Sequence, residues 1–239
     1  MKFSSALACL IILSILLLTG CATKPSLLET NPIGKEYTGS ITFRNKTVPL
    51  PEGTWKVIGT ELKDSFFRVV LLKNTSGKVM EDSIIIHVET NATIRDRGYV
   101  KTKDFEKSDY HYSEIFNNND GEAQDAFFVK HTRMSMNTKR EHLKKAFNYL
   151  IENNYIVPTV LIEGRHRFTG KNIKRKYLLF SYYKNPEAEG FAPPSNSDWH
   201  TSDWHPLHIS KDQKKEAYID NFIELSKTMH VQLKNGFGK

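Results

Sequence analysis

The run Phe66-Phe67-Arg68-Val69-Val70-Leu71-Leu72 is apolar at every position but one. Such continuity is typical of a strand that is covered on both faces or lies centrally in a sheet. Turn-forming residues follow in Asn74-Thr75-Ser76-Gly77, and the apolar pattern then returns in Ser83–Glu89. The sequence therefore predicts a β-hairpin in which residues 66–72 pair with residues 83–89.

Further strands are expected on both sides of this hairpin. Upstream, residues 41–44 and 55–59 alternate apolar and polar side chains, and a break is expected between them at Pro49–Gly53. Downstream, the polar stretch 91–125 is predicted to be a loop. Residues 126–134 are predicted to form the next strand.

A second hairpin is predicted later in the chain. Its strands are Thr159–Phe168 and Lys176–Tyr183, joined by turn chemistry at Thr169-Gly170-Lys171-Asn172. Asn185-Pro186 ends the return strand, because the residue before a proline is restricted and proline cannot donate to a ladder. Residues 187–209 are predicted to be a loop rich in Pro, Ser and Trp.

Two amphipathic helices are expected, each preceded by the pattern of a capping box. Thr138-Lys139-Arg140-Glu141 opens residues 138–154, in which apolar side chains recur at helical spacing. Ser210-Lys211-Asp212-Gln213 opens residues 210–235, whose apolar stripe requires a sheet to cover it. Strands and helices in this order, with hairpin-length turns, predict an α+β fold: a mainly antiparallel sheet built from hairpins and covered by the two helices.

The N-terminus has the sequence pattern of a cleaved targeting segment. Lys2 precedes an apolar run from Leu7 to Leu18, which is shorter than the ~20 residues that a bilayer-spanning helix needs. Leu18-Thr19-Gly20-Cys21 closes the run and resembles the lipobox of bacterial lipoprotein precursors. The alternative is a secreted protein in which the cysteine stands there by chance.

The resemblance to lipoprotein precursors implies a location and an anchor. It implies cleavage before Cys21, attachment of lipid to the thiol of Cys21, and acylation of the new amino terminus. Ala22 at the next position resembles the sorting pattern of outer-membrane lipoproteins. The chain would then divide into a cleaved signal peptide (1–20), a lipid-anchored tether (21–35) and a single α+β domain (36–239), with the domain facing the periplasm.

Composition restricts the chemistry of the folded part. The two cysteines are Cys9, which the signal peptide would carry away, and Cys21, so a disulfide framework, a cysteine metal site and a thiol nucleophile are not expected. The net charge of +7 becomes +6 because only Lys2 is lost with the signal peptide. This excess suits anionic lipid head groups or envelope polymers, or simply a solvated surface, and nucleic acid is not expected as a partner of an exported protein.

A histidine-rich segment offers a candidate metal site. Ser-Asp-Trp-His occurs twice within Ser197–His208, and imidazole and carboxylate groups suit Zn²⁺. The alternative is a loop held by Trp199 and Trp204 in apolar pockets, with its aspartates bonding locally to the backbone. The candidate ligands are His200, Asp203, His205 and His208.

A basic hairpin offers a candidate partner surface. Aromatic residues, including Tyr177 and Tyr183, interleave with the densest group of cations in the chain. Such a surface suits a sugar polymer, a lipid phosphate or a partner protein, although the solvated side of a hairpin has the same composition. The cations are Arg165, Arg167, Lys171, Lys174, Arg175 and Lys176.

The sequence contains no nucleophile elbow, His-Glu-x-x-His motif or repeat of solenoid length. We therefore expect a lipid-anchored envelope protein with a non-catalytic binding or accessory role and no cofactor. The alternative is a zinc-binding protein or metal-dependent hydrolase that uses the histidine-rich segment 198–208.

Overall fold

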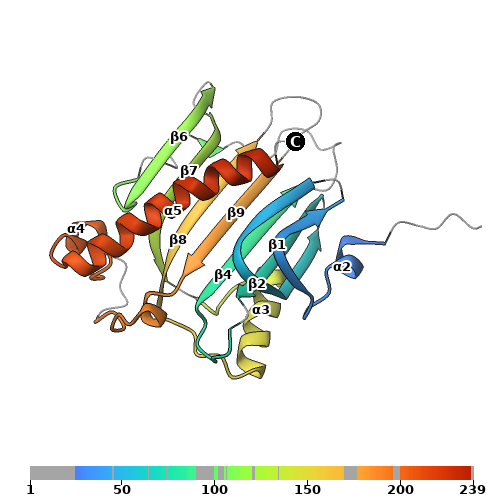
Figure 1. The fold of residues 1–239 in the computed structure, drawn as a ribbon, viewed down its shortest axis with the longest axis horizontal. Helices are drawn as coiled ribbons and strands as arrows, with labels where there is room; N and C mark the ends of the chain where they lie inside the picture. The colour runs from blue at the N-terminus through green and yellow to red at the C-terminus, as the bar shows by residue number, and fades with distance from the viewer. Residues whose placement is uncertain are drawn as a thin grey trace, which may run out of the picture.

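One antiparallel sheet dominates the computed structural model, which describes residues 25–44, 46–63, 65–73, 75–89, 100–101, 105, 107–119, 122–133, 135–169, 177–195 and 200–237 (Figure 1). Its nine strands in these residues are β1 (Glu36–Phe43), β2 (Lys46–Lys63), β3 (Phe66–Lys73), β4 (Asp82–Glu89), β5 (Val100–Lys101), β6 (Tyr112–Asn119), β7 (Glu122–Arg133), β8 (Val160–Thr169) and β9 (Tyr177–Lys184). The spatial order is β1-β2-β3-β4-β9-β8-β7-β5, and β6 also pairs with β7. The predicted α+β class and antiparallel sheet are confirmed.

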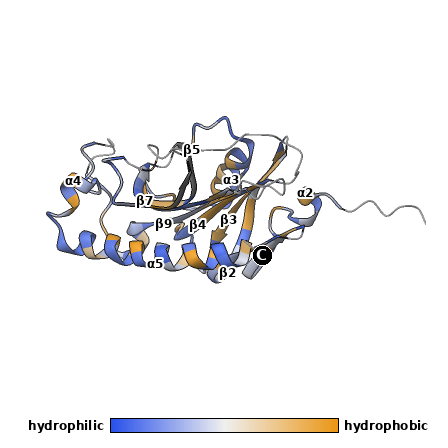
Figure 2. Cartoon of the chain, turned by 90° about the horizontal axis from the view of Figure 1, so that it is seen from above, coloured by the Kyte–Doolittle hydropathy of each residue, from blue (hydrophilic) through white to orange (hydrophobic). Residues whose placement is uncertain are grey.

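The helices lie on both faces of the sheet. The long helix α5 (Gln213–Phe237) crosses one face, and α3 (Glu141–Glu152) lies against the other, chiefly over β2 and β3 (Figure 2). The prediction of two covering helices is therefore confirmed in part, because α3 covers only part of its face. Short helical segments complete the described elements: α2 (Leu27–Thr30), a 3-10 helix η2 (Pro186–Glu189) and α4 (Pro206–Ile209).

Both predicted hairpins are confirmed. Leu71 pairs with Ile84 in the β3–β4 ladder, and Phe168 pairs with Leu178 in the β8–β9 ladder. The apolar run in β3 is buried on both faces, as its continuity predicted. Its residue Leu71 belongs to the core under α5, whereas its neighbour Leu72 belongs to the core under α3.

Strand β2 is continuous through Pro49–Gly53, where the sequence predicted a break. The strand continues from Lys46 to Lys63, and the irregularity is taken up by its pairing with β1. Thr38 pairs with Thr54, but Ser40 pairs with Pro49, so the intervening residues of β2 bulge out of the ladder. Gly53, with φ of 122°, supplies the left-handed backbone that this bulge needs.

Neither predicted capping box forms. Helix α3 begins at Glu141 after Arg140, which makes no side-chain cap, and Thr138 Oγ1 accepts a hydrogen bond from the Arg140 N–H instead. Helix α5 begins at Gln213, where the carboxylate of Asp212 accepts from the N–H groups of Lys214 and Lys215. The two helices therefore start three residues later than predicted.

Two stretches predicted to lack structure are partly ordered. In the expected tether 21–35, Ser26 and Glu29 form a capping box around α2, and Leu27 is buried in the main core. The described part of that segment is therefore folded onto the sheet. In the expected loop 91–125, β6 pairs along β7.

The expected loop 187–209 likewise contains η2 and α4. The signal peptide and Cys21 lie outside the described residues. Among the helices that the structure describes, none is long and apolar enough to cross a bilayer.

Candidate functional site

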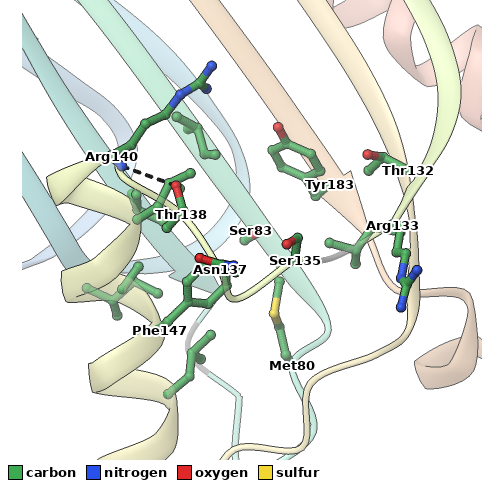
Figure 3. A pocket seen from close by; sticks show the side chains of 17 residues that line it. Met80, Ser83, Thr132, Arg133, Ser135, Asn137, Thr138, Arg140, Phe147 and Tyr183 are labelled. Atoms are coloured by element: carbon green, nitrogen blue, oxygen red, sulfur yellow. Dashed lines mark hydrogen bonds between the residues drawn. The ribbon is translucent and has the colours of Figure 1, made fainter.

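A pocket of about 300 Å³ opens between α3 and the part of the sheet that this helix leaves uncovered (Figure 3). Its floor is made by side chains of the central strands and its wall by α3. The linker between β7 and α3 passes along its mouth. The described lining residues are Ile58, Val70, Met80, Ser83, Ile85, Thr132, Arg133, Ser135, Asn137, Thr138, Arg140, Leu143, Ala146, Phe147, Leu150, Leu161 and Tyr183.

The position of α3 leaves this space open. Gly59 in β2 lets the helix approach so closely that a Cβ atom there would lie 2.2 Å from the carbonyl oxygen of His142. The side chain of His142 is also held to β2, because its Nδ1 lies 2.6 Å from Glu61 Oε2. Helix α3 is therefore fixed over β2, and the pocket occupies the space beside it, above β4 and β9.

Polarity changes from the bottom of the pocket to its mouth. The floor and the helical wall are aliphatic and aromatic, with Met80, Leu150 and Leu161 all buried. The mouth is polar, and the exposed residues Arg133 and Arg140 lie on two sides of it (Figure 3). In the described part of the chain, neither guanidinium makes an ion pair, and no carboxylate lines the pocket. The mouth is therefore electropositive.

An ionic network around the buried Glu163 supports the floor of the pocket at Tyr183. The hydroxyl of Tyr183 donates to Glu163 Oε1 over 2.9 Å, and the same oxygen lies 2.7 Å from Arg165 Nη2. Burial would raise the pKa of Glu163, but Arg165 and Lys130 more than offset this, and the pKa is lowered. Burial raises the pKa of Tyr183. Tyr183 therefore stays neutral, with its proton committed to Glu163.

This network changes the interpretation of the predicted basic hairpin. Arg165 lies over the ring of Phe128 at 5.4 Å, and Arg167 is buried with its guanidinium 5.3 Å from the Tyr177 ring centre. Arg167 is therefore buried in the sheet face, whereas the side chain of Arg165 is 34% exposed, and contact of either cation with a partner stays a prediction. The other four, Lys171, Lys174, Arg175 and Lys176, lie outside the described residues, and their contact with a partner stays a prediction.

The histidine-rich segment brings three of its four candidate ligands near one another. The ring centre of His205 lies 6.0 Å from that of His200 and 5.9 Å from that of His208. Asp203, however, is ion-paired with Lys215. His205 Nδ1 accepts a hydrogen bond from the Leu207 N–H at 3.2 Å, which caps α4. Within the described ranges, no group of three or more His, Cys, Asp or Glu residues is placed to hold a metal.

Two further histidines, which the sequence did not reveal, extend this group. His131 in β7 lies 5.5 Å from His205 by ring centres, and His111 lies 5.7 Å from His131. They were missed because they stand about 70 residues or more before His205 in the chain, and only the sheet brings them together. Burial lowers the pKa of His111 to about 3, so this ring is neutral at physiological pH. Trp204 is fully buried beside Phe191, as the apolar-pocket alternative predicted for it, and Trp199 lies outside the described residues.

A second buried polar group lies under α5. Asp125 Oδ1 lies 2.6 Å from His230 Nε2, and the other ring nitrogen of His230 lies 3.2 Å from His166 Nδ1. Phe116 and Phe168 stack on the two sides of this contact, each within 5 Å of the His230 ring centre. The group joins α5 to β7 and β8, and it is closed to solvent at His166 and His230. It therefore serves the attachment of α5.

No family model, curated protein or solved structure matches this chain. The function proposed for it rests on the residues of the pocket and of the N-terminus. The pocket is the stronger candidate site because it is open and lined from several elements, whereas the histidine group lacks convergent ligands in the described residues.

Proposed function

We propose that this chain is a lipid-anchored cell-envelope protein that binds an apolar ligand beneath α3 without transforming it. The observation that carries the proposal is the pocket of about 300 Å³, which has an apolar floor and a polar mouth. Pockets for small molecules have this size and this combination of apolar surface with a few polar groups.

The lining residues support a binding role over a catalytic one. Ser83, Thr132, Ser135, Thr138 and Tyr183 supply hydroxyl groups. The described lining contains no imidazole, carboxylate, amine or thiol that could act as a general base or activate a hydroxyl as a nucleophile. The proton of Tyr183 is committed to Glu163. The described lining can therefore hold a molecule, and it contains no group that would move a proton at neutral pH.

The location of this binding protein rests on Cys21. The lipobox sequence Leu18-Thr19-Gly20-Cys21 supports attachment to the outer membrane with the domain in the periplasm. Two or three acyl chains give stable membrane binding, whereas one chain is marginal. Radiolabelled palmitate should enter the wild-type protein, and Cys21→Ser should abolish both the labelling and the membrane fractionation.

Binding in the pocket can be tested with a neutral photoreactive alcohol in phosphatidylcholine nanodiscs that carry the full chain. We expect dodecanol bearing a terminal diazirine to label peptides of α3 and β8 on illumination. Ile85→Trp, which fills the pocket from β4, should abolish this labelling. The matched control Ile151→Trp places the same side chain on the exposed side of α3, where the residue is 59% exposed, and should leave labelling intact. Equal labelling of both variants would refute the pocket as the binding site.

The zinc alternative makes a different prediction for the purified protein. If His200, His205 and His208 held a metal, elemental analysis would find about one zinc per chain, and His205→Ala would remove it. We expect no stoichiometric metal, because Asp203 is engaged by Lys215 and His205 Nδ1 caps α4. Stoichiometric zinc that His205→Ala removes would show that the histidine-rich segment holds a metal and would favour the zinc alternative.

A further inference from the structure

We infer that the ligand of this pocket is an anionic amphiphile with a single aliphatic chain, whose head group lies against Arg133 and Arg140. The inference rests on the proposed function and names the class of ligand. It follows from the arrangement of charge around the pocket, from the apolar floor and from the volume available.

No described residue compensates the positive charge at the mouth of the pocket. Arg133 and Arg140 are exposed and make no ion pair with the described residues, and no acidic side chain lines the pocket between them. A guanidinium group binds carboxylate and phosphate through two parallel hydrogen bonds. The long arginine side chains can also cover an apolar chain with their stems while the charged ends meet its head group. An anionic head at the mouth therefore meets complementary partners.

Hydroxyl and amide groups stand between the two arginines. Ser135, Asn137 and Thr138 lie along the linker that borders the mouth (Figure 3). These side chains can donate hydrogen bonds to the oxygens of a carboxylate or phosphate. A cationic head group would instead face two like charges, and a neutral head group would leave both guanidinium groups without a partner.

The interior of the pocket suits one hydrocarbon chain. Its floor carries Val70 and Ile85 from the sheet and Met80 from the connection before β4. Phe147 and Leu150 face them from α3. A water molecule in the liquid occupies ~30 Å³, and a methylene group is of similar size, so about 300 Å³ holds a chain of roughly ten carbons. A lipid with two long chains would exceed this space, whereas a fatty carboxylate or a single-chain phosphate fits it.

The test is competition against the diazirine alcohol in the same nanodiscs, with the full chain. Dodecanoate and dodecyl phosphate should each suppress the labelling of α3 at a concentration at least tenfold lower than dodecanol does. The double variant Arg133→Gln/Arg140→Gln should lose this tenfold advantage and keep its response to dodecanol. Lys139→Gln, which removes an exposed cation that does not line the pocket, should retain the advantage. Partition into the lipid differs between the competitors but is the same for all variants, so it cancels when the ratio of anion to dodecanol concentrations is compared between variants.

The outcomes separate the two proposals. If the neutral probe labels the pocket but anions compete no better than dodecanol, or if the arginine double variant keeps the anion advantage, the inference about the ligand is wrong and the binding pocket stands. If the neutral probe does not label the wild-type pocket, the proposed function itself fails. Stronger competition by dodecyl phosphate than by dodecanoate would assign the head group to the phosphate class, and the reverse would assign it to the carboxylate class.

Discussion

Asp125 makes two close charged contacts with α5. One carboxylate oxygen lies 2.6 Å from His230 Nε2 and the other lies 2.6 Å from Lys234 Nζ. Hydrogen bonds to charged groups contribute about 1.5–3 kcal/mol each to stability. Removal of one partner costs more when the other stays buried without a hydrogen bond. We expect Asp125→Asn to lower the free energy of unfolding by about 2–3 kcal/mol in urea titrations. Lys234→Met should cost less than 1 kcal/mol, because the side chain of Lys234 is 57% exposed.

The contribution of Asp125 to the free energy of unfolding depends on pH. Burial would raise the pKa of Asp125, but its hydrogen bonds with His230 and Lys234 offset this, and the pKa is lowered. The stabilisation is therefore fully present above the ordinary aspartate pKa of about 4 and is lost as the pH falls through the lower pKa of the folded state. The stability difference between wild type and Asp125→Asn should shrink below pH 4. A constant difference down to pH 2 would contradict this assignment.

His87 should make the protein less stable in mild acid. Its ring lies between Phe66 and Tyr177, and burial, with a smaller contribution from Arg68, lowers its pKa to about 3. Between pH 6.5 and 3 the unfolded chain binds a proton that the folded protein does not, so stability falls as the pH falls. One such histidine lowers the free energy of unfolding by up to about 2 kcal/mol as the pH falls from 6.5 to 5. His87→Phe should keep the ring packing and reduce the loss measured by urea titration at these two pH values.

At the scale of the element, the packing of α3 on β2 depends on the absence of one side chain. Gly59 faces the backbone of α3 at residues 142 and 146, and any Cβ atom there would overlap it. Overpacking of this kind costs about 1–3 kcal/mol, and more when backbone must move. We expect Gly59→Ala to lower the free energy of unfolding by about 3 kcal/mol and to alter labelling of the pocket. Gly77→Ala, where the nearest atom is 3.8 Å away, is the control and should change stability by less than about 0.5 kcal/mol.

Local sequence patterns predicted the elements that local forces dominate. Both hairpins were predictable because their apolar residues and turn residues agree in register, as the pairing of Leu71 with Ile84 confirms. The predicted helix starts were wrong. Thr138 and Asp212 accept hydrogen bonds from the N–H groups of Arg140 and Lys214, and sequence spacing alone does not distinguish these contacts from a capping box. Strand β6 was missed because its sequence shows little alternation of apolar and polar residues. Its hydrogen-bonded pairing with β7, which the sequence does not reveal, defines it as a strand.

At the scale of the whole molecule, the pocket could not be predicted from the sequence. Its lining comes from β2, β3, β4, β7, β8, β9, α3, the linker before α3 and the connection before β4, and each residue alone is an ordinary apolar or polar side chain. Only the spatial order of the strands and the offset of α3 create the space. The histidine group is a similar case, because His111 and His131 join His205 only through the sheet. The candidate ligands His200, His205 and His208 are therefore only part of the cluster of neighbouring histidine rings in the structure.

The short connection between Cys21 and α2 should hold the domain against the membrane. Leu27 is buried and Ser26 caps α2, so only residues 22–25 separate the folded domain from Cys21, the residue that we propose carries the lipid. Even fully extended, the chain from Cys21 to Ser26 spans at most ~18 Å. This is a tighter attachment than a tether ending at residue 35 would give. The exposed apolar side chains of Leu28 and Ile33 lie at this end of the molecule and would face the lipid first.

Depth-dependent quenching can measure this orientation, because α2 and α4 lie at opposite ends of the molecule (Figure 1). A fluorophore on Ile33→Cys should be quenched strongly by brominated lipids in the anchored protein. The same label on Leu207→Cys, where the native residue is 73% exposed in α4, should be quenched at least several-fold less. Inserting ten Gly and Ser residues after Lys24 should reduce quenching at position 33, because a longer flexible chain lets the domain leave the surface. Equal quenching at the two positions, or no effect of the insertion, would show that the domain is not held at the membrane by its α2 end.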